Sequence, residues 1–154
     1  MSTAFSLRLD IEKHGWARFT VSDGDRTFET RGVSDLTDAL GDMVRAAADM
    51  AEGAERSVFS FDGEPVETRV TLDRLSAADL RIRVVQYADI YRPSALETGD
   101  ERISTTVPVA AFARTVLREA DRIRSATGDE AYERNWGEAY PARDVEILRA
   151  ALRI

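Results

Sequence analysis

One stretch of the sequence decides the fold class, and it begins Val66-Glu67-Thr68-Arg69-Val70-Thr71-Leu72-Asp73. Its even-numbered positions are apolar or threonine, and its odd-numbered positions are mostly charged. This period of two is typical of a strand with one face on the core and one face toward solvent. After the polar segment 76–79 the same alternation returns as Leu80-Arg81-Ile82-Arg83-Val84. Two such runs joined by a short polar segment predict a pair of antiparallel strands.

Working outward from this pair, the same pattern predicts further strands on both sides. Residues 5–11 alternate clearly, and shorter runs follow at 17–21, at 27–31 around Phe28, at 58–61 and at 103–106. The segments between them carry turn residues, which include His14-Gly15 and Asp23-Gly24. Asp and Gly tolerate the positive φ angles that tight hairpins need, so these strands are expected to form meanders.

Helical spacing of apolar residues appears in four places. The first helix is expected after Ser34 as its N-cap, and it should end at Gly53. A second should begin at Pro108 and end at Gly128, followed by a short helix with Tyr132 and Trp136 and a last one after Pro141. The stripes that should face the core are Leu36, Leu40, Met43, Val44, Ala47 and Met50 in the first helix, and Val109, Phe112, Ala113, Val116, Leu117, Ala120 and Ile123 in the second.

These elements predict an α+β fold in a single domain that spans residues 1–154. The expected order is βββ-α-ββββ-α-α, with an antiparallel meander sheet of six or seven strands and the helices packed on one face. The other face should carry ladders of mixed charge, with Arg8, Asp10, Arg18, Glu29, Arg31, Glu67, Arg69, Arg81 and Arg83.

Composition narrows the classes of function. The net charge is −7, which disfavours nucleic acid as a partner and suits a basic protein. The chain has no cysteine, which excludes thiol chemistry and thiolate metal sites. No run is apolar enough for a signal peptide or a membrane span, so we expect a cytoplasmic protein that does not contact a membrane. Lys13 is the only lysine among 21 basic residues, a bias that indicates a GC-rich bacterial genome.

Residues that could carry catalysis are few. His14 is the only histidine, and it lies in an expected turn. Acidic pairs flank glycines at Asp23-Gly24-Asp25 and Asp62-Gly63-Glu64, where Asp and Gly serve hairpin geometry. Phosphate-binding glycine loops, nucleophile motifs and calcium loops are absent from the sequence. We therefore predict no catalytic residue, no metal site and no cofactor.

The candidate contact surface is the region between Tyr87 and Glu101. It is the longest irregular stretch, it is acidic, and tyrosine flanks it. Tyrosine and tryptophan beside arginine are common anchors of protein interfaces, whereas the same rings at element ends also serve to cap a core. The predicted binding residues are Tyr87, Asp89, Tyr91, Arg92, Glu97, Asp100 and Glu101. Trp16, Tyr132, Trp136 and Tyr140 are open to both interpretations.

Three segments together resemble a pattern of small acidic bacterial proteins. They are residues 34–40 (Ser-Asp-Leu-Thr-Asp-Ala-Leu), residues 59–65 (Phe-Ser-Phe-Asp-Gly-Glu-Pro) and the helix that ends with Tyr132 and Trp136. Some proteins of this kind resemble immunity proteins encoded beside polymorphic toxins. The resemblance implies neutralisation of a toxin by direct binding, and it supplies no site residues.

Three functions remain open from the sequence. The first is a non-catalytic binding protein, such as an immunity protein that binds a basic toxin. The second is a small-ligand-binding protein or a carboxylate-based hydrolase, which requires a deep pocket that holds at least two of Asp62, Glu64, Tyr87 and Tyr91. The third is a structural homo-oligomer, for example a homodimer joined through a sheet edge or the aromatic end.

Overall fold

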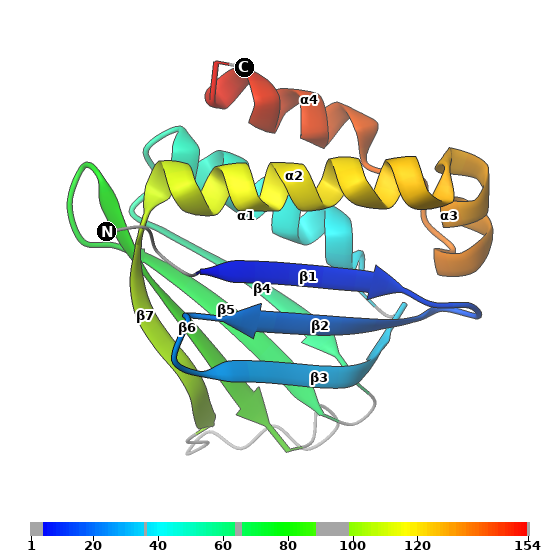
Figure 1. Ribbon diagram of the computed structural model, residues 1–154, viewed down its shortest axis with the longest axis horizontal. Helices are drawn as coiled ribbons and strands as arrows, with labels where there is room; N and C mark the ends of the chain where they lie inside the picture. Colours follow the sequence, from blue (N-terminus) through cyan, green and yellow to red (C-terminus); the bar gives the residue numbers. More distant parts are fainter. Residues whose placement is uncertain (1–4, 36, 64–65, 89–98, 154) are drawn as a thin grey trace.

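A computed structural model describes the chain at residues 5–35, 37–63, 66–88 and 99–153 (Figure 1). In these ranges seven strands form two antiparallel sheets, each of them a meander. The first sheet contains β1 (Ser6–Ile11), β2 (Trp16–Ser22) and β3 (Thr27–Ser34). The second sheet contains β4 (Arg56–Asp62), β5 (Glu67–Arg74), β6 (Asp79–Tyr87) and β7 (Asp100–Pro108).

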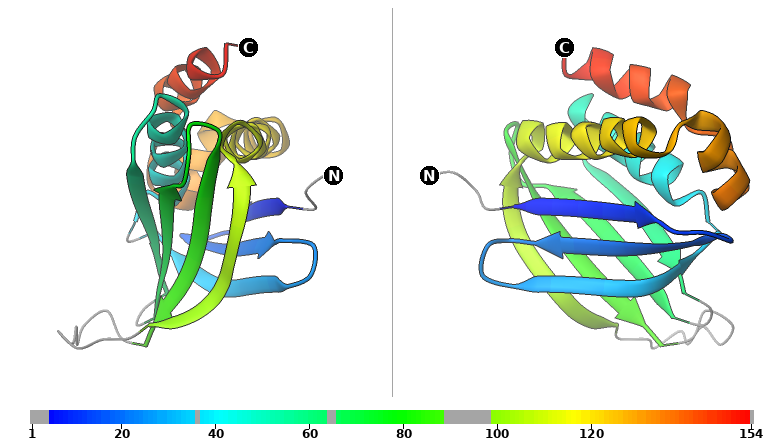
Figure 2. Two further views of the ribbon diagram at one scale, coloured as in Figure 1. Left: turned by 90° about the vertical axis from the view of Figure 1, so that its left-hand side faces the viewer. Right: turned by 45° about the vertical axis from the view of Figure 1, so that its right-hand side comes forward.

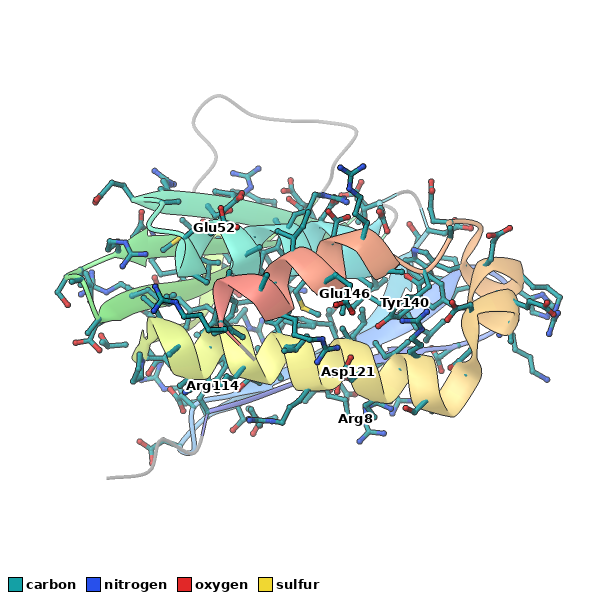
Figure 3. All side chains as sticks on the ribbon, turned by 90° about the horizontal axis from the view of Figure 1, so that it is seen from above. Arg8, Glu52, Arg114, Asp121, Tyr140 and Glu146 are labelled. Atoms are coloured by element: carbon teal, nitrogen blue, oxygen red, sulfur yellow. The ribbon has the colours of Figure 1, made fainter. Side chains whose placement is uncertain are left out.

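The same ranges contain four helices, which are α1 (Ala39–Ala51), α2 (Val109–Thr127), α3 (Asp129–Trp136) and α4 (Ala142–Ala151). The two sheets face each other with their strands crossing, and the helices gather above both sheets (Figures 1 and 2). Seen from above, α1 and α2 lie side by side and α4 lies over them (Figure 3). None of the helices in the described ranges is both long and apolar enough to cross a membrane.

The α+β class and the antiparallel meanders are confirmed, but the expectation of one sheet is wrong. The connection through α1 takes the chain from the first sheet to a second one, so β3 and β4 belong to different sheets. Each sheet covers the inner face of the other, and the helices close one side of the pair instead of covering one face of a single sheet (Figure 2). The short α3 is the helix that the sequence predicts around Tyr132 and Trp136.

The core lies between the two sheets and under the helices. Phe19 of β2 and Phe61 of β4 are fully buried and meet edge to face, with ring centroids 4.6 Å apart. The apolar stripe expected for α2 is buried throughout, as is that of α1 at Leu40, Met43, Val44, Ala47 and Met50, while Leu36 lies outside the described residues. Burial of this apolar surface is the main source of stability for both layers.

Helix α1 begins later than the sequence pattern predicts. Ser34 is not its N-cap, because Ser34 still pairs with Trp16 across the sheet. The N-cap is Asp38, whose carboxylate accepts a hydrogen bond from the backbone amide of Gly41 at 3.3 Å. Aspartate satisfies the exposed amides of a first turn as well as serine does, so competition from the strand decides where the helix starts. Its end at Gly53 is as predicted, with φ at 109°.

Two sheet edges lie against the helical layer. At the edge of β1, Glu119 of α2 accepts a hydrogen bond from the Leu9 amide at 2.6 Å, and Arg122 donates to the Leu9 carbonyl at 3.1 Å. At the other end of the layer, α1 lies along β4, the edge strand of the second sheet. At β1 these bonds from α2 cover the edge, which is a common means of keeping unpaired backbone groups from another chain.

Candidate functional site

The structure places three of the predicted binding residues at the ends of neighbouring strands. Tyr87 ends β6, while Asp100 and Glu101 begin β7. In the sheet register Glu101 lies opposite Val85, and Asp100 lies opposite Gln86. Because side chains alternate between the two faces of a strand, Tyr87 and Glu101 share the outer face, whereas Asp100 belongs to the inner side. Asp89, Tyr91, Arg92 and Glu97 lie outside the described residues.

A connected set of side chains crosses the outer face of the four-stranded sheet around Tyr87. The guanidinium of Arg69 lies over the Tyr87 ring, 4.3 Å from its centroid. Arg69 also donates two hydrogen bonds to Glu67, at 2.9 and 3.1 Å, and the Ser60 hydroxyl donates to the same carboxylate at 3.0 Å. The set joins β4, β5 and β6, so it holds an arginine and a tyrosine in fixed positions on an exposed face.

The β7 side of this face is also ordered. Arg83 of β6 donates to Glu101 of β7 at 2.8 Å. Gly99 comes so close to the sheet that a methyl group there would overlap Val85 Cγ1 and lie 2.8 Å from Tyr87 Cε1. Glycine at this position therefore lets the chain approach the Tyr87 ring. The outer face carries the ladders of mixed charge that the sequence predicts for Glu67, Arg69, Arg81 and Arg83.

Most of the other end-of-element aromatic residues belong to the core. Tyr132, Trp136 and Tyr140 are buried, so their interpretation as interface anchors is wrong and core capping is correct. Tyr140 also donates a hydrogen bond to the Ala120 carbonyl at 2.7 Å, and burial raises its pKa to about 12. Trp16 is 39 % exposed and belongs to the first sheet. The Arg69–Tyr87 pair therefore marks the second sheet as the face with an interface-type anchor.

The free edge of β4 adjoins this outer face, and the sheet register shows which groups it exposes. The Gly63 amide donates to the Val66 carbonyl at 2.5 Å, and the Arg74 amide donates to the Glu55 carbonyl at 2.8 Å. Hydrogen-bonded positions alternate along an antiparallel pair, so Ser57, Phe59 and Phe61 bond to β5. The backbone amides and carbonyls of Val58 and Ser60 consequently point to the free edge. No hydrogen bond joins them to another group in the described ranges.

A hollow of about 460 Å³ runs between this edge and α1. Residues 57–60 form one wall, and the other is a stripe on α1 with Asp42, Arg45, Ala46 and Asp49. Arg45 is shared among three carboxylates, with Asp144 at 2.8 Å, Asp38 at 3.3 Å and Asp42. Asp49 is exposed, and no ion pair to it is found among the described residues. The hollow therefore has an acidic wall on α1 that faces the unpaired edge of β4.

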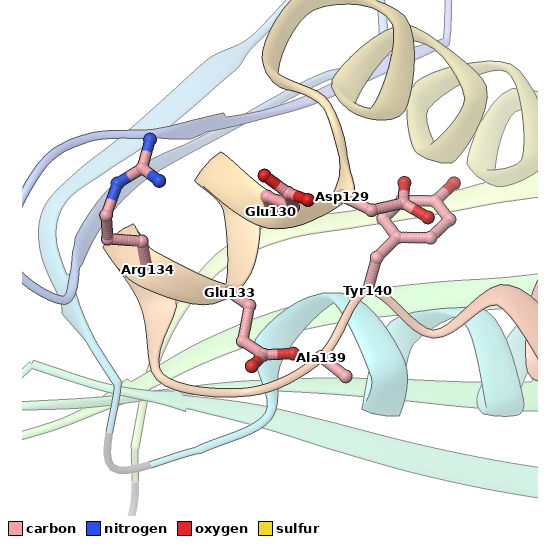
Figure 4. A pocket seen from close by; sticks show the side chains of 6 residues that line it. All are labelled: Asp129, Glu130, Glu133, Arg134, Ala139 and Tyr140. Carbon is pink, nitrogen blue, oxygen red and sulfur yellow. The ribbon is translucent and has the colours of Figure 1, made fainter.

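The carboxylates of the chain do not converge on a catalytic pocket in the described ranges. A hollow of about 420 Å³ beside α3 is lined by Asp129, Glu130, Glu133, Arg134, Ala139 and Tyr140 (Figure 4). Its side chains point in different directions, and Asp129 is paired with Arg124 at 2.9 Å. A third hollow is lined by Arg74 and the end of α1. None of these three is lined by Asp62 or Tyr87, and Glu64 and Tyr91 lie outside the described residues.

The remaining candidates for chemistry occupy turns. His14 is exposed in the turn between β1 and β2, with φ at 63°. The Asp23 carboxylate accepts the amides of Asp25 at 2.9 Å and Arg26 at 2.7 Å, and these bonds lower its pKa. It thus serves hairpin geometry, as expected. Within the described ranges, histidine and the acidic residues form no group of three that could hold a metal ion.

The sequence pattern does not predict two structural features of this region. The first is the free edge of β4, because alternation identifies a strand but not which strands flank it. The second is the pairing of Arg69 with Tyr87, which depends on the register between β5 and β6. A possible signal was the exposed valine at position 58, which is 44 % exposed on the polar face of its strand.

Comparisons with known proteins do not place the chain in a family. What this surface does must be inferred from its own residues. No family model matches the sequence, and no curated protein or solved structure matches it either.

Proposed function

We propose that this protein is a non-catalytic binding protein that contacts another protein through the outer face of its four-stranded sheet. The observation that carries the proposal is the fixed Arg69–Tyr87 pair, with Glu67 and Ser60 behind it. In the views of Figure 2 the helices lie above the sheets, and no helix of the described ranges crosses this face. Arginine and tyrosine held in place lose little conformational entropy on binding, which is why they are common anchors.

The charge of the chain supports a basic partner. The net charge is −7, and α1 adds Asp38, Asp42 and Asp49 beside the edge of the same sheet. An acidic surface of this kind increases the rate of encounter with a positively charged protein. Together with the resemblance to immunity proteins, this favours a toxin as the partner, which the protein would neutralise by occupying the surface that the toxin uses.

Site-specific photo-crosslinking in the source cell tests the proposal. We would place benzoylphenylalanine at Arg83 on the proposed face, and at Thr20 on the outer face of the three-stranded sheet as the matched control. We expect a discrete adduct from position 83, with a basic protein, and none from position 20. The absence of an adduct, equal adducts at both positions or a covalent dimer of the chain itself would contradict the proposal.

Neutralisation of a toxin has a separate test. We expect the product of a neighbouring gene to arrest growth when it is expressed alone, and this protein to restore growth when both are expressed. The double variant R69A/Y87A removes the anchor pair of the outer face without adding negative charge; it should fold normally but should no longer restore growth. Full rescue by this variant would rule out the outer face as the neutralising surface.

A further inference from the structure

We infer that the hollow between α1 and β4 binds an extended segment of a basic protein, which adds to β4 as a further strand. This inference deepens the proposed function and rests on it for the identity of the ligand as a protein. Strand addition derives its affinity from backbone hydrogen bonds along an open edge and its specificity from the side chains beside it. Both components are present along residues 57–60 and the facing side of α1.

The backbone component consists of the unpaired amides and carbonyls of Val58 and Ser60. Their amides and carbonyls point away from β5, as the register shows, and no other described group bonds to them. An added strand would lie about 4.8 Å from β4, in the space that the hollow provides. Val58 is 44 % exposed, so it also offers an apolar contact to a side chain of the added strand.

The specificity component is the α1 wall. Asp42, Arg45, Ala46 and Asp49 are spaced as one face of a helix, and this face borders the hollow. The positive charge of Arg45 is already shared with Asp38, Asp42 and Asp144, so the wall is acidic on balance. A segment with arginine or lysine at alternate positions would place a cation beside Asp49 while its backbone pairs with β4.

Asp49 lies at a position where a negative charge destabilises a helix. It lies in the last turn of α1, where no basic residue is present, and Glu52 follows it at the C-cap. A negative charge at this end opposes the helix dipole. The same acidity argues against a second copy of this chain as the occupant, because two copies paired through β4 would bring their Asp49 residues to the same edge.

The experiment uses the full isotope-labelled chain and three synthetic peptides of one length. The first alternates arginine with valine, the second replaces arginine with glutamate, and the third interrupts the first with proline. We expect the arginine peptide to bind with sub-millimolar affinity, to shift the amide signals of residues 57–60 and to slow hydrogen exchange at Val58 and Ser60. The glutamate and proline peptides should cause no such protection.

Three variants make the result specific. D49K should weaken binding of the arginine peptide by about tenfold or more, and a tenfold loss corresponds to about 1.4 kcal/mol. The same variant should gain binding to the glutamate peptide. E52K is the matched control, since Glu52 is an exposed acid on the same helix that does not line the hollow (Figure 3). V58P should abolish binding and keep the fold, because proline at this position removes an amide that does not bond to β5.

The outcomes separate the two proposals. Failure of the arginine peptide to bind, equal binding of the glutamate peptide or an unchanged affinity in both D49K and V58P would overturn strand addition. An adduct from position 83 in the photo-crosslinking experiment would still support the outer face in that case. Binding of the arginine peptide at β4 without any adduct from position 83 would instead overturn the outer face and leave the edge site in place.

Discussion

Glu119 of α2 accepts the backbone amide of Leu9 across 110 positions of the chain. Together with Arg122, which donates to the Leu9 carbonyl and to Glu119 itself, it occupies the place of a neighbouring strand. The side chain of Glu119 is buried, so this contact is shielded from water. One edge of the first sheet is thus blocked by a helix, while β4 at the other end of the helical layer keeps free backbone groups.

The first prediction concerns this contact. We expect E119A to lower the free energy of unfolding by about 2–4 kcal/mol, because it leaves the buried Leu9 amide without its acceptor and removes the nearer of the two carboxylates that pair with Arg122. D121N is the control on the same helix, since Asp121 forms an exposed pair with Arg149 worth at most about 1 kcal/mol. Urea denaturation measures both variants, and equal losses would show that Glu119 does not hold the β1 edge.

The second prediction concerns alkaline pH. Burial raises the pKa of Tyr140 to about 12, whereas an unfolded tyrosine titrates near 10. The folded protein therefore holds this proton more tightly, and stability should be complete below about pH 10 and fall as the pH rises toward about 12. Urea midpoints at neutral pH and at about pH 11 measure the effect.

The matched variant for that measurement is Y140F. At neutral pH it should cost about 0.5–1.5 kcal/mol, because the hydrogen bond to the Ala120 carbonyl is lost. Above pH 10 its stability should fall less steeply than that of the wild type. Some dependence should remain, since burial also raises the pKa of Tyr132. Parallel curves for the two proteins would contradict the assignment to Tyr140.

The third prediction concerns Gly99. We expect G99A to destabilise the protein by about 1–3 kcal/mol, because the added methyl group overlaps Val85 and crowds the Tyr87 ring. Displacement of that ring should also lower the affinity of any partner that binds the outer face. Thermal unfolding and the tyrosine side-chain NMR signals give the two readouts. G53A is unsuitable as a control because φ is 109° there, whereas S104A changes the same face without crowding.

The fourth prediction concerns Asp49 in the absence of a ligand. We expect D49N to raise the free energy of unfolding by a few tenths of a kcal/mol, because it removes a negative charge from the C-terminal turn of α1. Raising the salt concentration should shrink the gain, since exposed charges are screened. A loss of stability in D49N would mean that Asp49 has a structural role, and would weaken the case for it as a binding residue.

The sequence pattern predicts the individual strands and helices, but it does not predict how the strands are divided between two sheets. Alternation at residues 66–73 and 80–84 predicted strands that the structure contains, since local burial alone produces that pattern. Whether β3 and β4 are neighbours depends on how α1 packs, which no local pattern encodes. Ser34 illustrates the same limit, because its cross-strand pairing with Trp16 outweighed its preference for an N-cap.

The candidate site was predicted only in part for a related reason. Tyr87 and Glu101 were recognised from an irregular acidic stretch, and they do share one face. Arg69, the partner of Tyr87, belongs to the neighbouring strand β5, so its role became visible only with the register between β5 and β6. For Tyr132 and Trp136 the sequence pattern is the same in a core and at an interface, and the structure buries both in the core.

The span between Leu9 and Glu119 also sets an order of events during synthesis. In the part of the chain that the structure describes, every strand pair joins strands that are neighbours in the sequence, so each sheet can form soon after its residues leave the ribosome. The edge of β1, however, has no cover until α2 has been made, 110 residues later. At about 5–20 residues per second, the nascent chain presents an open strand for roughly 5–20 seconds. The edge of β1 is therefore open to pairing with other chains during this interval.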